Sequence, residues 1–129
     1  MNKFFLTFFP IFLFAQWINY PYILKLKKDE TANFEVHSKN KIYPLKIRWT
    51  LYKNDFLILL YKYDNFPRQI TLFKNYPLNT FKINLLHYPM LNPYLLIEFK
   101  DFDGKIATFE INLFNKDDIR IKRLKNGVF

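Results

Sequence analysis

The chain has 129 residues, of which 50% are hydrophobic and 21% aromatic, with 20 Lys and Arg against 11 Asp and Glu and no cysteine. The lack of cysteine excludes disulfides and thiolate chemistry, and the two isolated glycines exclude glycine-rich nucleotide-binding loops. A net charge of +9 is compatible with nucleic acid, anionic lipid or an acidic protein as partner. Because an AT-rich coding sequence also enriches Lys, Asn, Ile, Phe and Tyr, the charge alone identifies no ligand.

Residues 1–15 have the pattern of a signal peptide. Lys3 provides the positive start, residues 4–14 are apolar, and Ala15 is a small residue suited to cleavage. As a helix the apolar run is about 16 Å long, roughly half of the ~30 Å that a spanning helix crosses. We therefore expect export to the periplasm or cell exterior, no transmembrane span after cleavage, and a single domain at residues 16–129. An uncleaved anchor that extends through Trp17 and Ile18 is the alternative.

Apolar and polar residues alternate with a period of two along most of the remaining chain, which indicates strands with one buried face. Such runs occupy residues 22–26, 32–36, 45–51, 81–85, 95–99, 107–113 and 119–121. Turn-forming residues separate them. Eight or nine short, mostly antiparallel strands predict an all-β fold, either a single immunoglobulin-like β-sandwich or, as the alternative, a small β-barrel.

A central hairpin is predicted to turn at residues 53–55. A three-residue loop pairs Leu51 with Leu57, Trp49 with Leu59 and Ile47 with Tyr61. The opposite face then carries an apolar set that serves as our candidate interaction face: Tyr52, Phe56, Ile58 and Leu60. Such a set is too apolar for an ordinary solvated surface. Another envelope protein or a second copy of the chain would cover it; the alternative cover is the chain's own segment around Trp17 and Tyr20.

The hairpin from Leu45 to Leu60, with its inward-facing Trp49, resembles the central hairpin of immunoglobulin-like domains, although the cysteines of antibody domains have no counterpart here. The resemblance implies a sandwich. The short, exported, Lys-, Asn- and Phe-rich chain as a whole is similar to envelope proteins of Gram-negative bacteria, which implies a partner in the envelope.

A second hairpin is predicted to turn at residues 102–104, with Gly104 in a left-handed conformation. A three-residue loop pairs Leu95 with Ile111, Ile97 with Phe109, Phe99 with Ala107 and Asp101 with Lys105. Together the two hairpins predict a core that contains Leu45, Ile47, Trp49, Leu51, Ile97, Phe99, Phe109 and Ile111.

No constellation of residues indicates catalysis, a cofactor or a metal. Ser38 follows His37 directly, and neighbours on a strand point to opposite faces. His37 and His87 lack the spacing of zinc ligands, and residues 101–104 lack the later ligands of a calcium loop.

The basic residues Arg120, Lys122, Arg123 and Lys125 are interpreted as a charged edge strand, since Lys on an edge prevents pairing with other molecules. No nucleic-acid partner is therefore expected. The sequence favours a non-enzymatic envelope protein that serves as an interaction or assembly module. The alternative is a carrier of a lipid, glycan or other apolar ligand, with aromatic residues lining a cavity.

Overall fold

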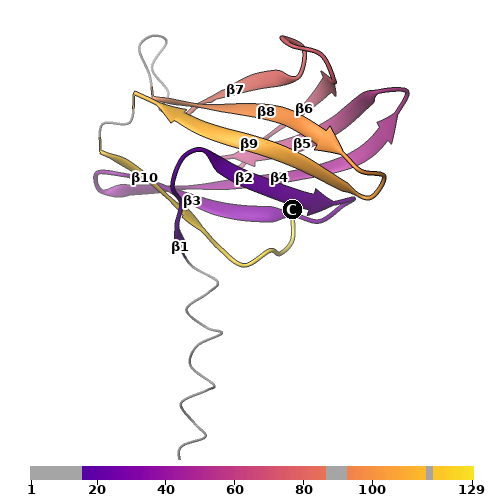
Figure 1. The fold of residues 1–129 in the computed structure, drawn as a ribbon. Helices are drawn as coiled ribbons and strands as arrows, with labels where there is room; N and C mark the ends of the chain where they lie inside the picture. Colours follow the sequence, from indigo (N-terminus) through magenta and orange to yellow (C-terminus); the bar gives the residue numbers. More distant parts are fainter. Residues whose placement is uncertain (1–15, 87–92, 116–117) are drawn as a thin grey trace, which may run out of the picture.

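The computed structural model describes residues 16–86, 93–115 and 118–129; the predicted signal peptide and His87 lie outside them. As predicted, the fold is an all-β sandwich of two antiparallel sheets packed face to face, and it is not a closed barrel (Figure 1). The described residues form ten strands, which are β1 (Gln16–Trp17), β2 (Tyr22–Lys27), β3 (Ala32–Ser38), β4 (Lys41–Lys53), β5 (Phe56–Tyr63), β6 (Phe66–Phe73), β7 (Thr80–Asn84), β8 (Tyr94–Phe102), β9 (Ile106–Phe114) and β10 (Ile119–Arg123).

The strands form a six-stranded sheet in the order β1-β10-β3-β4-β5-β6 and a four-stranded sheet in the order β2-β9-β8-β7. Strands β3 to β6 form one meander and β7 to β9 another, and the chain changes sheet after β1, β2, β6 and β9. Alternation in the sequence did not mark β1 or β6, which lie at the two edges of the larger sheet. The sandwich architecture is the one that immunoglobulin-like domains share, with a strand order of its own.

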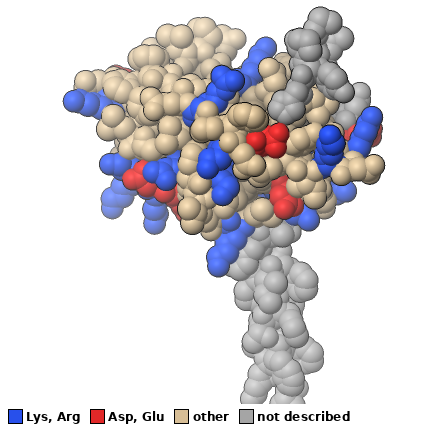
Figure 2. Space-filling model, turned by 180° about the vertical axis from the view of Figure 1, so that it is seen from behind, with Lys and Arg blue, Asp and Glu red and all other residues tan. Residues whose placement is uncertain are grey.

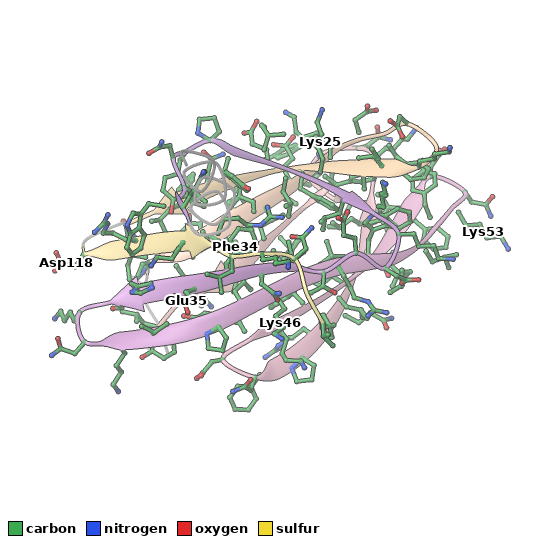
Figure 3. The ribbon with its side chains drawn as sticks, turned by 90° about the horizontal axis from the view of Figure 1, so that it is seen from below. Lys25, Phe34, Glu35, Lys46, Lys53 and Asp118 are labelled. Atoms are coloured by element: carbon green, nitrogen blue, oxygen red, sulfur yellow. The ribbon has the colours of Figure 1, made fainter. Side chains whose placement is uncertain are left out.

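The core lies between the sheets and is built from the inward residues of alternating strands. In the view from below, Phe34 lies between the two layers, whereas Lys46 and Lys25 point away from them on opposite sides (Figure 3). The structure confirms that these predicted core residues are buried: Leu45, Ile47, Trp49, Ile97, Phe99, Phe109 and Ile111. The prediction for Leu51 is wrong, because 42% of this residue is exposed.

A β-bulge in the central hairpin explains the position of Leu51. The predicted pairs of Trp49 with Leu59 and of Ile47 with Tyr61 are confirmed. The register then shifts between Trp49 and Leu51, so that Leu51 pairs with Ile58 on the outer face. The turn contracts to two residues, Asn54 and Asp55, both with positive φ of 51° and 67°, as in hairpins with a type I′ turn.

The second hairpin also contains a bulge, between Phe99 and Asp101. The three predicted apolar pairs are wrong by two residues, since the structure pairs Leu95 with Leu113, Ile97 with Ile111 and Phe99 with Phe109. Beyond the bulge the prediction is wrong by three, since Asp101 pairs with Thr108 and not with Lys105. The apolar set nevertheless stays on one face, because a shift of two conserves side-chain direction. Gly104 has a positive φ of 104°, as predicted.

Candidate functional site

Phe56, Ile58 and Leu60 lie in a row on the outer face of β5, where each is half-buried. Directly paired residues of antiparallel strands share a face. Phe73 of β6 therefore lies beside Phe56, and Leu51 of β4 lies beside Ile58. We call this set of five apolar residues from three strands the outer stripe: Leu51, Phe56, Ile58, Leu60 and Phe73.

Tyr52 does not belong to this face, contrary to our interpretation of the sequence. The bulge turns it inward, where it pairs with the buried Leu57 and stacks on Phe102 with 4.1 Å between ring centroids. Sequence reasoning missed Leu51 and Phe73, because the bulge that exposes one and the strand that carries the other have no local signal. Of the four candidates, the structure brings Phe56, Ile58 and Leu60 together.

Four cations border the outer stripe on the same face, and we call them the basic rim: Lys46, Arg48, Lys53 and Lys62. Lys53 pairs with Phe56 at one end of the stripe, and Arg48 pairs with Leu60 at the other. Lys46 and Lys62 face each other in a further row. Figure 2 looks at this side of the molecule and shows uncharged side chains over much of its upper part, with Lys and Arg mainly along the margins and lower half.

Residues 124–129, which we call the strap, cross the outer face of β3 and β4. Gly127 forms a bridge with Thr31, and Asn33 Nδ2 donates to the carbonyl oxygen of Lys125 at 3.1 Å. Lys46 Nζ donates to the carbonyl oxygen of Val128 at 2.8 Å. The strap therefore ends beside the outer stripe.

Phe129 extends the apolar surface at this end. Its ring lies 5.5 Å from the guanidinium carbon of Arg48 and 4.8 Å from Lys62 Nζ. Lys62 Nζ also donates to the main-chain oxygen of Phe129 at 3.2 Å. Contacts of this geometry are cation–π interactions, and they hold two cations of the basic rim in place.

The alternative cover, the segment around Trp17 and Tyr20, lies elsewhere. Trp17 pairs with Lys122 at the opposite edge of the sheet from β6. Its ring lies 3.8 Å from the guanidinium carbon of Arg120 and 4.9 Å from Lys122 Nζ. β10 therefore lies between β1 and β3, and its interpretation as an edge strand is wrong. Two of its cations serve to hold Trp17.

The free edge of β6 is largely blocked. Phe73 N–H points away from β5 and donates to the carbonyl oxygen of Leu78 at 3.0 Å. Since backbone groups alternate in direction, Gln69 and Thr71 point the same way, and so does Pro67, which has no N–H to donate. The outward backbone groups of Gln69 and Thr71 form a short stretch, which gives an added strand few hydrogen bonds. The outer stripe, rather than the edge, is the candidate site.

The residues considered for chemistry have structural partners. His37 Nε2 lies 3.0 Å from Glu35 Oε1, and its ring meets the edge of Trp17. Asp103 Oδ1 accepts hydrogen bonds from the backbone N–H groups of Ile106 and Lys105, which lower the pKa of this carboxyl group. In the described ranges no group of three His, Cys, Asp or Glu side chains is placed to hold a metal ion.

No family model, curated protein or solved structure matches this chain. Within the part of the chain that the structure describes, no helix has the length and hydropathy needed to cross a membrane.

Proposed function

We propose that the protein is a non-enzymatic interaction module of the envelope, exported by its N-terminal segment, that docks onto another envelope protein through the outer stripe. One observation carries this proposal: five apolar side chains from β4, β5 and β6 gather on the outer face of a sheet. Single apolar residues on a surface are ordinary, but a contiguous set marks an interface. The flat face of a sheet suits packing against another protein.

The packing of the interior supports docking over the carriage of an apolar ligand. A carrier needs aromatic side chains that line a space. Here the inward rings contact one another: Tyr61 stacks on Phe81 at 5.5 Å, and Phe99 lies 5.8 Å from Phe109. The rings of Tyr61 and Phe81 join the two sheets, whereas the outer stripe lies on an outer face that a partner can reach.

The double variant Ile58→Lys with Leu60→Lys tests the docking. Both side chains lie on the outer face, so we expect the melting temperature to fall only slightly while association with the partner is lost. Association would be measured by recovery of the partner from envelope extracts, with a stability scan on the same samples. Ile23→Lys, on the outer face of the four-stranded sheet, is the matched control and should associate normally.

Two results would contradict the proposal. A collapse of stability in the double variant would show that the outer stripe is part of the core, and normal association would show that partners bind elsewhere. Export has its own test, the N-terminal residue of the mature protein: Gln16 supports cleavage, whereas recovery of the Met1 form in membranes supports an anchor.

A further inference from the structure

The basic rim contains a like-charge pair, Lys46 and Lys62, whose described acceptors are oxygens of the strap. Lys46 and Lys62 are directly opposite on β4 and β5, an arrangement that destabilises a sheet. Both lysines donate to main-chain oxygens of the strap. Among the described residues, the basic rim forms an ion pair through Arg48, whose Nη2 lies 3.4 Å from Asp29 Oδ1. The rim therefore keeps a net positive charge.

The outer face of the four-stranded sheet provides an internal comparison. Glu98 and Glu110 are likewise directly opposite there. Lys100 bridges them, with Nζ at 3.6 Å from Glu98 Oε2 and 3.9 Å from Glu110 Oε1. A lysine side chain thus lies between the two carboxylates on one face, whereas no Asp or Glu side chain among the described residues forms a described ion pair with Lys46 or Lys62 beside the outer stripe; their acceptors there are the main-chain oxygens of Val128 and Phe129.

We propose, on the basis of the function given above, that the docking partner is a protein surface with an apolar centre and an acidic border. The apolar centre packs on the outer stripe, and carboxylates pair with the basic rim. Complementary charge of this kind accelerates encounter and sets orientation. The strap holds Lys46, Lys62 and Arg48 in position before binding, which lowers the ordering cost of the interface.

Two other occupants fit the surface less well. A second copy of the chain would place one basic rim against another in a two-fold arrangement, which brings like charges together. An anionic bilayer would match the charge, but insertion into lipid needs apolar side chains that project from the surface. Phe56, Ile58 and Leu60 are half-buried on the face of the sheet, which suits a protein surface.

The experiment combines crosslinking with measured affinities. A photo-reactive phenylalanine analogue replaces Phe73 in cells that make the full chain, and the same analogue at Ile23 is the control; the two residues are 41% and 47% exposed. The partner that crosslinks at Phe73 is identified and purified, and the affinity of the wild-type chain for this partner is measured. Three double variants follow: Ile58→Lys with Leu60→Lys, Lys46→Glu with Lys53→Glu, and Lys25→Glu with Lys27→Glu.

We expect an adduct from Phe73 but not from Ile23, with a heterologous protein that has an acidic surface. Affinity should fall about tenfold or more in the Lys46→Glu, Lys53→Glu variant and stay unchanged in the Lys25→Glu, Lys27→Glu variant. It should also weaken strongly between about 0.1 M and about 1 M salt, because the screening length shortens from ~10 to ~3 Å.

Several outcomes would overturn the acidic partner. One such outcome is that the Ile58→Lys, Leu60→Lys variant abolishes binding while neither salt nor the Lys46→Glu, Lys53→Glu variant affects it. That result would refute the acidic border but would still support docking through the outer stripe. An adduct with twice the mass of the chain would identify a second copy. Rim-dependent co-sedimentation with vesicles of phosphatidylglycerol and phosphatidylethanolamine would identify lipid. No adduct at Phe73, together with normal recovery of partners from envelope extracts by the Ile58→Lys, Leu60→Lys variant, would refute the docking function itself.

Discussion

Tyr20 buries its hydroxyl oxygen against the core with no hydrogen-bond partner among the described residues. Burial disfavours the charged phenolate and raises the pKa of Tyr20 from 10.0 to about 12. Burial also raises the pKa of Tyr63, whose hydroxyl donates to the carbonyl oxygen of Leu85. The two tyrosines have the same cause of perturbation, but only Tyr63 gains a described hydrogen bond.

These shifts predict a loss of stability in alkali. Between about pH 10 and pH 12 the unfolded chain releases the Tyr20 proton while the folded chain keeps it, so the free energy of unfolding falls as pH rises. Below about pH 10 both states are protonated and the contribution is constant. We expect Tyr20→Phe to reduce this alkaline decline without lowering stability at pH 7, since it removes an unpaired polar group. Urea unfolding of both proteins across this range is the measurement, and equal slopes would contradict the prediction.

Two bulges, one in each sheet, determine which residues meet at one end of the sandwich. The bulge in β4 turns Tyr52 inward, and the bulge in β8 allows Phe102 to pair with Ala107 on the inner face. The two rings stack, and Phe102 also meets the edge of Trp49 at 5.4 Å. A shift of one residue exchanges the faces of a strand. Alternation in the sequence therefore predicts burial up to each bulge and is wrong beyond the first one, at Leu51.

The bulges could not be predicted, because Thr50 and Lys100 are ordinary residues for a regular strand. β6 is missed for a different reason: it is an edge strand in which Leu72 is buried and most other side chains are exposed. Alternation is visible only where one face is covered. Phe73 thus joins the candidate face through the pairing of β6 with β5, which no local pattern reveals.

The turn between β5 and β6 offers a test at the level of one element. Asp64 and Asn65 both have positive φ, 52° and 67°, which residues with a Cβ adopt at a cost. Glycine avoids that cost at the second position of a type I′ turn. We expect Asn65→Gly to raise the free energy of unfolding by about 0.5–1 kcal/mol, measured by chemical denaturation. Asn65→Val should lower it, and the opposite order would contradict the assigned turn.

The arrangement of the whole molecule depends on pairings between distant segments. β2 pairs with β9, β3 pairs with β10, and β1 pairs with β10, so strands from the two ends of the sequence lie side by side in both sheets. Local periodicity predicts strands and hairpins but carries no information on such partners, which is why the sandwich was predicted and its strand order was not. The candidate face is different, because it is built from three consecutive strands. Alternation along β5 predicted its central row, and the bulge in β4 and the pairing of β6 with β5 added Leu51 and Phe73.

Trp49 joins the two sheets by both packing and a hydrogen bond. The side chain lies in the six-stranded sheet and is 3% exposed. Its Nε1 donates to the carbonyl oxygen of Leu26, in β2 of the other sheet, at 2.8 Å. Arg123 makes a similar link through Nη1 to the hydroxyl of Tyr22 at 2.7 Å. The side chains of Trp49 and Arg123 therefore link the two sheets by hydrogen bonds within a mainly apolar interface.

Substitution of Trp49 tests whether this link matters for the whole fold. Trp49→Ala removes a buried indole and should cost about 3–5 kcal/mol, a large part of the stability of a small domain. Trp49→Phe keeps most of the packing but leaves the Leu26 carbonyl group without this donor, at a cost of about 1–3 kcal/mol. Trp17→Phe is the matched control: its ring is 39% exposed, so the change should be about 0.5 kcal/mol or less. Urea unfolding followed by circular dichroism measures all three.

A Trp49→Ala protein that unfolds like the wild type would show that the two sheets do not depend on this residue. Equal losses of stability for Trp49→Phe and Trp49→Ala would assign the contribution of Trp49 to the hydrogen bond rather than to packing.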